Sequence, residues 1–163
     1  MKTMTKQTIA LSALIAGLAA VPAMADDAAP YIFGQATHAR ETNGDKDVAN
    51  GVGVGLGYKF NRNFAVEGGV TNLKDRPGMS DESANIRAVG IVPVSDKVDV
   101  FGKVGMARVG TTLGSSAHDD LTYGVGAGYK LDRNWMLRAD YDRLKGASDE
   151  RQNLFSAGAQ YNF

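Results

Sequence analysis

Residues able to act as a nucleophile, a general base or a metal ligand are few in this chain. It has two histidines, His38 and His118, and no cysteine. Hydrolysis or acyl transfer needs a nucleophile within reach of a base, and neither histidine is followed at the second position by a serine. His118, Asp119 and Asp120 carry metal-binding atoms, but three adjacent residues rarely converge on one ion. The sequence therefore predicts no catalytic residue, no metal and no cofactor.

A second set of polar residues recurs inside apolar segments. Its members are single charged residues spaced along the chain: Glu67, Arg87, Lys103, Arg138 and Asp140. Both signs are present, so the chemistry that they offer is ion pairing in a shared interior. Such pairing requires structural elements that point all five side chains to the same place.

The segment 51–60 identifies those elements as strands. Apolar residues occupy every second position, from Val52 to Phe60, and the alternate positions carry four glycines and Lys59. In a helix each glycine would cost about 1 kcal/mol and the apolar residues would scatter around the circumference. The run Gly-Val-Gly-Val-Gly could suggest a dinucleotide-binding loop, but no helix follows it. A strand is the better interpretation.

Eight segments show this alternation, each about the length that a tilted strand needs to cross a membrane. They are 31–40, 51–60, 64–71, 84–93, 98–106, 121–131, 135–142 and 155–163. Short turns at 61–63, 94–97 and 132–134 alternate with longer polar connections at 41–50, 74–82, 110–120 and 145–151. The pattern predicts an all-β, eight-stranded antiparallel up-and-down barrel with both termini at the end of the short turns.

The composition of the two strand faces distinguishes a membrane barrel from a soluble one. A soluble barrel would expose the face that combines glycines with charges, and glycine is unfavourable in exposed strands. A narrow lumen explains the same face, because small residues leave room for a few long charged chains. We therefore expect the apolar face to contact lipid. The five charged residues would then form a lumen network, with pairing that fixes the structure as the favoured role and gating as the alternative.

The first 25 residues read as a targeting segment. Lys2 and Lys6 precede an apolar stretch, and Ala23-Met24-Ala25 is a typical signal-peptidase site. Cleavage after Ala25 would leave residues 26–163 as one barrel domain, and an uncleaved anchor is the alternative. Basic and acidic residues balance at 18 each, which indicates no nucleic-acid partner. The expected location is the cell outer membrane.

An internal repeat strengthens the barrel prediction. The segment Gly55-Leu-Gly-Tyr-Lys-Phe-Asn-Arg-Asn-Phe64 corresponds to Gly126-Ala-Gly-Tyr-Lys-Leu-Asp-Arg-Asn-Trp135. Each copy is a hairpin with aromatic residues beside its turn. Aromatic residues would thus gather at one membrane interface. The predicted aromatic girdle consists of Tyr58, Phe60, Phe64, Tyr129, Trp135, Tyr161 and Phe163.

Together these motifs resemble the OmpA-like transmembrane β-barrel family. The resemblance covers 30–163 and rests on the repeated hairpin, Val92-Pro93-Val94-Ser-Asp-Lys97, Leu137-Arg-Ala-Asp-Tyr141 and the terminal Gly158-Ala-Gln-Tyr-Asn-Phe163. It implies that Phe155, Tyr161 and Phe163 form an assembly signal for the barrel assembly machinery. The resemblance is to the short, barrel-only members, so we do not expect the peptidoglycan-binding domain of full-length OmpA.

The resemblance also implies a function and partners. We expect a monomeric, non-enzymatic barrel that supports envelope integrity and has at most a narrow, charge-plugged pore. A small specific pore and a surface adhesion protein are alternatives. A lipid A-modifying enzyme that would use His38 is less favoured. Expected partners are outer-membrane lipids, lipopolysaccharide, the assembly machinery and periplasmic chaperones.

Overall fold

Eight strands make up the regular structure of the described part of the chain. The computed structural model describes residues 28–41, 48–76, 79–111, 118–145 and 151–163, so the predicted signal peptide lies outside the described residues. In this part of the chain, no helix is long and apolar enough to cross a membrane. The strands are β1 (Ala29–Glu41), β2 (Val48–Lys59), β3 (Phe64–Arg76), β4 (Met79–Pro93), β5 (Val98–Thr111), β6 (His118–Lys130), β7 (Trp135–Lys145) and β8 (Arg151–Asn162).

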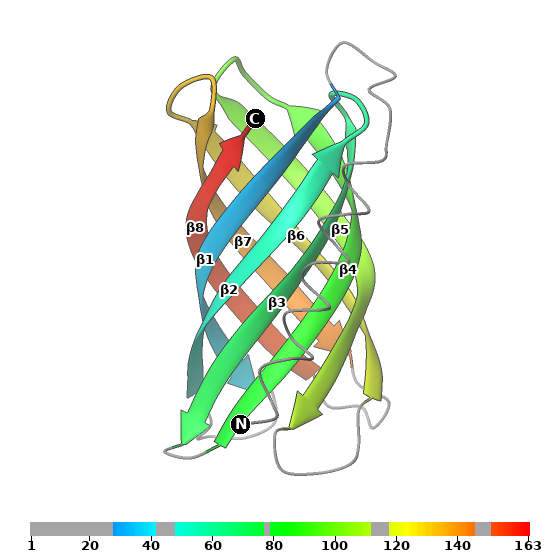
Figure 1. The fold of residues 1–163 in the computed structure, drawn as a ribbon, viewed down its shortest axis with the longest axis vertical. Coiled ribbons are helices and arrows are strands. Elements are labelled where there is room, and N and C mark those ends of the chain that lie inside the picture. The colour runs from blue at the N-terminus through cyan, green and yellow to red at the C-terminus, as the bar shows by residue number, and fades with distance from the viewer. Residues whose placement is uncertain (1–27, 42–47, 77–78, 112–117, 146–150) are drawn as a thin grey trace, which may run out of the picture.

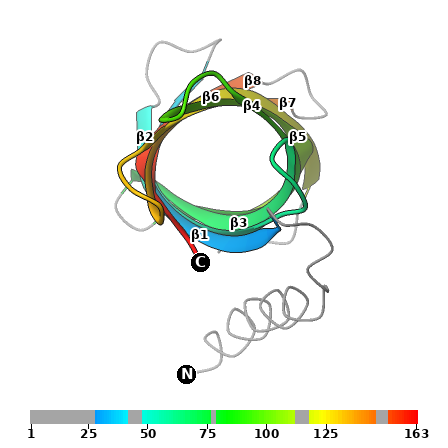
Figure 2. The same cartoon turned by 90° about the horizontal axis from the view of Figure 1, so that it is seen from above.

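The sheet closes on itself, as the sequence predicts. Each strand pairs antiparallel with its neighbours in sequence, and β1 also pairs with β8 from Tyr31–Asn162 to Glu41–Gln152. Figure 1 shows the tilted strands, and Figure 2 shows the closed ring along its axis. Phe163 lies beside the start of β1, where its backbone amide donates to the Pro30 carbonyl over 3.2 Å. We call this end of the barrel, which also carries the three short turns, the turn end, and the opposite end the loop end.

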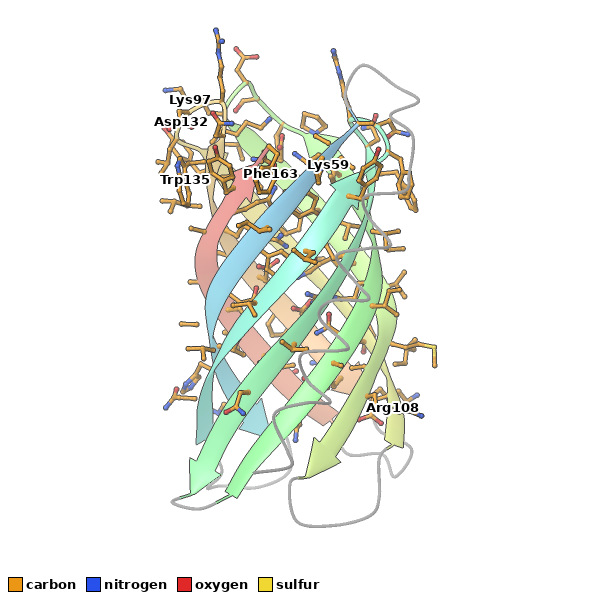
Figure 3. All side chains as sticks on the ribbon, viewed as in Figure 1. Lys59, Lys97, Arg108, Asp132, Trp135 and Phe163 are labelled. Atoms are coloured by element: carbon orange, nitrogen blue, oxygen red, sulfur yellow. The ribbon has the colours of Figure 1, made fainter. Side chains whose placement is uncertain are left out.

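The outward face of the strands has the predicted apolar composition, and the inward face holds the predicted glycines and charged residues. Side chains project from the barrel wall throughout its height (Figure 3), and the outward ones are apolar over the middle of each strand, as in Val52, which is 67% exposed. The inward positions hold glycines and buried polar groups, such as Glu67 at 1% and Lys103 at 3% exposure. Alternation along a strand therefore assigns the five predicted lumen charges and the glycines of the segment 51–60 to the lumen correctly.

The inward face is more apolar than the sequence analysis expects. A buried cluster of Tyr31, Phe33, Ala65, Val89, Ile91 and Phe101 fills the lumen. Phe33 and Phe101 belong to strands in which apolar residues occur on both faces, so the period-two signal is weak there. The lumen is thus a packed core with embedded charges.

The four longer connections are shorter than predicted. The interval predicted as the loop 74–82 is mostly strand, because β3 continues to Arg76 and β4 begins at Met79. The other three intervals are shortened in the same way, and His118 is the first residue of β6 instead of a loop residue. The apolar alternation stops where the strands leave the hydrophobic band, but backbone pairing continues, and hydropathy does not report it.

The repeated hairpins end in equivalent turns. The side-chain oxygen of Asn61 accepts from the Asn63 amide at 2.8 Å, and that of Asp132 accepts from the Asn134 amide at 2.8 Å. Asp132 also accepts from the amide of Trp135. The hydrogen bonds that Asp132 accepts from the backbone amides of Trp135 and Asn134, that of Trp135 above all, hold the pKa of the Asp132 carboxyl below its ordinary value.

Each repeated turn is also tied to the strand that follows its hairpin. The side-chain Nδ2 of Asn63 donates to the Ile91 carbonyl at 3.0 Å, and the side-chain Nδ2 of Asn134 donates to the Asn162 carbonyl at 2.9 Å. The duplicated asparagine therefore joins β4 to one hairpin and β8 to the other at the turn end.

We expect Asn63→Ala and Asn134→Ala each to lower the free energy of unfolding by about 0.5–1.5 kcal/mol, the usual net worth of one hydrogen bond. The losses should add in the double variant, because the two turns share no partner. Urea titration of the folded barrel in lipid vesicles measures them. Arg133→Ala changes an exposed turn residue and should have no effect. Two asparagine variants as stable as the parent would contradict the structural role of these side chains.

Candidate functional site

The five charged residues predicted for the lumen network meet inside the barrel. Glu67, Arg87, Lys103, Arg138 and Asp140 are all at least 95% buried. They come from β3, β4, β5 and β7, so the cluster reaches across the lumen. A sixth residue, Asp142 of β7, completes it with 3% exposure. We call these six residues the charge ring.

The charge ring is a closed cycle in which positive and negative groups alternate. Arg138 contacts Glu67 at 2.6 Å and Asp140 at 3.4 Å. Lys103 then bridges Asp140 at 2.7 Å and Asp142 at 3.2 Å. Arg87 closes the cycle, 3.1 Å from Asp142 and 3.6 Å from Glu67. Three cations balance three carboxylates, so the buried cluster is neutral as a whole.

The internal repeat explains why Glu67 and Arg138 face each other. The two residues are 71 positions apart, which is the spacing that relates Gly55 to Gly126 in the repeated hairpins. The β2–β3 and β6–β7 hairpins lie on opposite walls of the closed sheet. Equivalent lumen positions in the two copies therefore point at each other, and in this chain they carry opposite charges.

Two aromatic rings hold the Arg138 guanidinium between them. Its central carbon lies 4.7 Å from the Phe33 ring centroid and 4.8 Å from that of Phe101. Phe33 is paired with Gly55, and Phe101 with the repeat-equivalent Gly126. A β-carbon at either glycine would collide with the facing ring. Because Gly55 and Gly126 have no side chain, they leave room for the two rings. We call Phe33 and Phe101 the aromatic clamp.

Neutral groups complete the cluster on its turn-end side. The Tyr31 hydroxyl donates to Glu67 at 2.9 Å, and Arg138 donates to the Gln160 side-chain oxygen at 3.0 Å. A cavity lined in part by Tyr31, Gln160 and Asp99 has a volume of about 10 Å³, enough for about one water molecule. Asp99 itself forms an ion pair with Lys130 at 2.8 Å.

Sequence reasoning found five of the six charges and missed the aromatic clamp. Asp142 lies two positions beyond Asp140 on β7 and therefore on the same face of the strand. The same period-two signal could have placed it in the network. Phe33 and Phe101 are harder to find, because aromatic strand residues usually suggest the lipid face. The usable signal is the glycine opposite each ring, and it becomes visible only once the strand register is known.

The two histidines lie apart from the charge ring. His38 is exposed on the outside of β1, and its Nδ1 lies 2.8 Å from the side-chain oxygen of its cross-strand partner Asn50. His118 and Asp119 pair through the backbone with Val109 and Arg108. Among the residues that the structure describes, no group of three His, Cys, Asp or Glu side chains could hold a metal ion.

The predicted girdle residues gather at the turn end. Figure 3 places Trp135 and Phe163 there, and both are exposed. The Tyr161 ring contacts both, with centroid distances of 5.1 Å in each case. On the other copy, Phe60 contacts Tyr58 at 5.2 Å and Phe64 at 5.8 Å, and Tyr58 is buried at 5% exposure. Phe155 of the predicted assembly signal lies farther along β8, opposite Tyr141.

Comparison with solved structures finds barrels of the same fold. Neisserial surface protein A (NspA) is 20% identical, with a TM-score of 0.64, and the match covers 85% of this chain and 100% of that one. The N-terminal barrel of Pseudomonas aeruginosa OprF is 14% identical with a TM-score of 0.64, over 82% and 97%. The Yersinia pestis attachment invasion locus protein Ail, solved with the heparin analogue sucrose octasulfate, is 18% identical with a TM-score of 0.56, over 83% and 97%.

No curated protein sequence matches the chain. The profile of the outer membrane protein beta-barrel domain, however, matches residues 11–163, which include all eight strands. The closed antiparallel sheet, the apolar outer face and the polar lumen agree with that match. The chain therefore belongs to the outer membrane protein beta-barrel domain family.

Proposed function

We propose that this protein is a non-enzymatic barrel that stabilises the outer membrane and does not conduct ions through its lumen. The observation that carries the proposal is the charge ring, which crosses the lumen and is closed on itself. An ion that passed through would have to separate buried pairs, and a buried charge without a partner costs several kcal/mol. The ring therefore acts as a structural plug.

The packing around the ring supports a closed lumen. The Phe33–Arg138–Phe101 stack fills the lumen beside the ring, and the cavity next to it has room for about one water molecule. Opening this plug would expose apolar rings and leave carboxylates without cations. Gating of a small pore is the alternative role for the same residues.

The proposal includes a route to the membrane, which rests on the residue types in 1–25 and in β8. The segment 1–25 acts as a cleaved signal peptide, and periplasmic chaperones pass the chain to the barrel assembly machinery. Phe155, Tyr161 and Phe163 form the signal that this machinery recognises. The turn end then faces the periplasm and the loop end faces outward, with the aromatic girdle at the inner interface. Within the family, the repeated hairpin makes OmpA-like barrels the best comparison.

Planar-bilayer recording tests the closed lumen. We expect the wild-type barrel to insert without discrete conductance steps. A variant that lacks both clamp rings and the Arg138 side chain, Phe33→Ala with Phe101→Ala and Arg138→Ala, should show steps, because the charge ring is then open and the lost side chains leave a water-filled path. Recovery of the folded wild-type barrel from the same membranes, recognised by its gel shift on heating, separates a closed lumen from a failure to insert. Discrete steps in the wild type would overturn the proposal in favour of a small pore.

The envelope role has its own test. A strain that lacks the protein should admit more of a large apolar dye, and expression of the wild-type chain should restore the barrier. If the deletion strain has an unchanged barrier, the envelope role is wrong even when the lumen is closed.

A further inference from the structure

The outer surface of β7, β8 and β1 carries an ordered grid of residues near the loop end. Cross-strand pairing places Arg143, Asn153 and Arg40 side by side in one row. The next row toward the turn end is Tyr141, Phe155 and His38, and the row after that is Ala139, Ala157 and Ala36. The surface thus changes over three rows from basic to aromatic to small.

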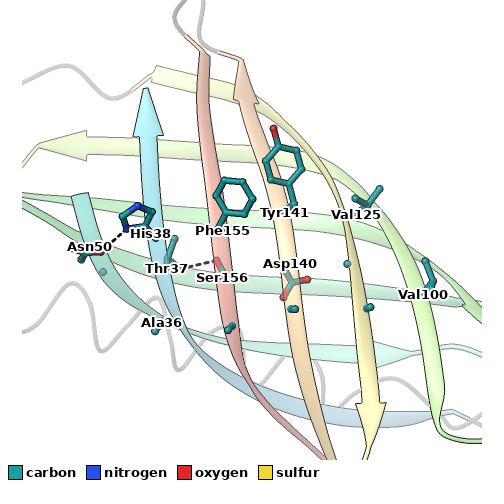
Figure 4. Close-up of a pocket in the computed structure, with 15 residues that line it drawn as sticks. Ala36, Thr37, His38, Asn50, Val100, Val125, Asp140, Tyr141, Phe155 and Ser156 are labelled. Atoms are coloured by element: carbon teal, nitrogen blue, oxygen red, sulfur yellow. Dashed lines mark hydrogen bonds between the residues drawn. The ribbon is translucent and has the colours of Figure 1, made fainter. Parts of the chain in front are cut away.

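The small row is the floor of a groove. A cavity of about 700 Å³ lies over these strands and includes the aromatic and alanine rows in its lining. Figure 4 shows Phe155, Tyr141 and His38 around it. The rings of Tyr141 and Phe155 pack at a centroid distance of 4.8 Å and form one wall. Because the surface faces hydrocarbon, an acyl chain fits this groove in shape and polarity.

Hydrogen bonds between neighbouring side chains order the basic row. Asn153 accepts hydrogen bonds from Arg143 Nε and from the Tyr141 hydroxyl, both at 3.0 Å. That hydroxyl also accepts from Arg143 Nη2 at 3.4 Å. Together with a side-chain hydrogen bond from Arg143 to Tyr123, its partner on β6, these contacts fix the plane of the guanidinium. Arg40 is exposed and, among the described residues, has no hydrogen-bond or ion-pair partner.

The position of this row along the membrane normal matches that of a lipid headgroup. Along β7, Trp135 marks the girdle, and Arg143 is four outward positions farther on. With a rise of about 3.4 Å per residue and a tilt of about 40°, the two lie about 20 Å apart in height, close to the 25 Å of an apolar band. Arg40 and Arg143 flank one strand, so their backbones are about 10 Å apart and both side chains can reach one phosphate group.

We propose that this surface binds a phosphate-bearing lipid of the adjacent leaflet. Arg40 and Arg143 bind the phosphate oxygens, and an acyl chain lies over Ala36, Ala139 and Ala157. Arginine forms charge-assisted, often bidentate hydrogen bonds with phosphate, and two cations beside an apolar groove are the combination that an anionic lipid satisfies. The inference rests on the membrane location and not on a closed lumen, so bilayer recordings do not decide it.

Native mass spectrometry of the folded barrel in detergent tests the proposal, with diphosphorylated lipid A as the probe. We expect the wild type to retain one lipid A molecule and to retain phosphatidylcholine poorly. Arg40→Gln combined with Arg143→Gln should weaken lipid A retention about tenfold or more, because two charge-assisted contacts are lost. Arg133→Gln removes the same charge from the turn end and should leave retention unchanged.

A second pair of variants separates a lipid site from simple attraction of phosphate. Ala157→Phe fills the groove floor and should weaken lipid A retention, while competition by inorganic phosphate stays weak for every variant. Arg40→Gln alone serves if the double variant folds poorly, because Arg40 has no partner in the described part of the chain to lose. Equal retention of phosphatidylcholine, or unchanged lipid A retention in Arg40→Gln and Ala157→Phe, would overturn the proposal.

Discussion

Replacing Arg138 with methionine is expected to lower the free energy of unfolding by about 3–5 kcal/mol, the usual cost of removing one partner from a buried ion pair. The change leaves Glu67 and Asp140 buried without the guanidinium that both contact, at 2.6 Å and 3.4 Å. Methionine keeps much of the apolar volume between Phe33 and Phe101, so the loss reports mainly the missing charge. Urea unfolding in lipid vesicles measures it, with the folded fraction read from the shift between unheated and heated samples on SDS gels.

A charge swap tests whether Arg138 belongs to a ring or only to a pair. In Glu67→Arg with Arg138→Glu, an isolated pair would re-form with its signs exchanged. In the ring, the new glutamate faces Asp140 and the new arginine faces Arg87, so like charges meet at two contacts. We therefore expect the swapped variant to remain as unstable as Arg138→Met, while Arg133→Met in the exposed turn has no effect. Recovery of most of the stability in the swapped variant would contradict the ring.

How much of this arrangement could be predicted from the sequence depends on which physical rule places each residue. Period-two alternation assigns a side chain to one face, and it places Glu67, Arg87 and Lys103 in the lumen correctly. It does not say which residues meet, because that depends on strand register and on closure of the sheet. The contact between Glu67 and Arg138 follows only once β3 and β7 stand on opposite walls.

The errors of the sequence analysis have a common physical source. Hydropathy reports the solvent that a side chain faces, whereas strand length depends on backbone pairing. The polar stretches around Arg76 and Met79 are therefore paired strand although they look like a loop. For the same reason, hydropathy could not assign Phe33 to the lumen, because an aromatic ring has the same hydropathy whether it faces the lumen or the lipid.

The repeat shows what a sequence signal can carry once the fold is known. From sequence, the two copies indicate two similar hairpins. In the closed barrel they become opposite walls, and their equivalent glycines, Gly55 and Gly126, make room for the two rings that clamp Arg138. These lumen glycines are therefore needed for the close packing of the rings against Arg138.

Gly57 provides the most direct test of that view. The three atoms nearest to a β-carbon there would all be ring atoms of Tyr31, which is 2% exposed and donates a hydrogen bond to Glu67. We expect Gly57→Ala to destabilise the barrel by about 1–3 kcal/mol, the usual cost of overpacking a core. The ring cannot move aside without breaking its bond to the charge ring. The same urea titration measures the change.

A matched control comes from a glycine on the other face. An added β-carbon at Gly34 has no atom within 4 Å, so Gly34→Ala should leave stability unchanged or raise it by up to about 1 kcal/mol through lower entropy of the unfolded chain. Combining Gly57→Ala with Tyr31→Ala should remove most of the extra cost, because the obstructing ring is gone. If Gly57→Ala is as stable as Gly34→Ala, the lumen has spare volume at Tyr31. Close packing of the lumen around Tyr31 would then be excluded, because a close-packed interior is destabilised by the addition of even one methyl group.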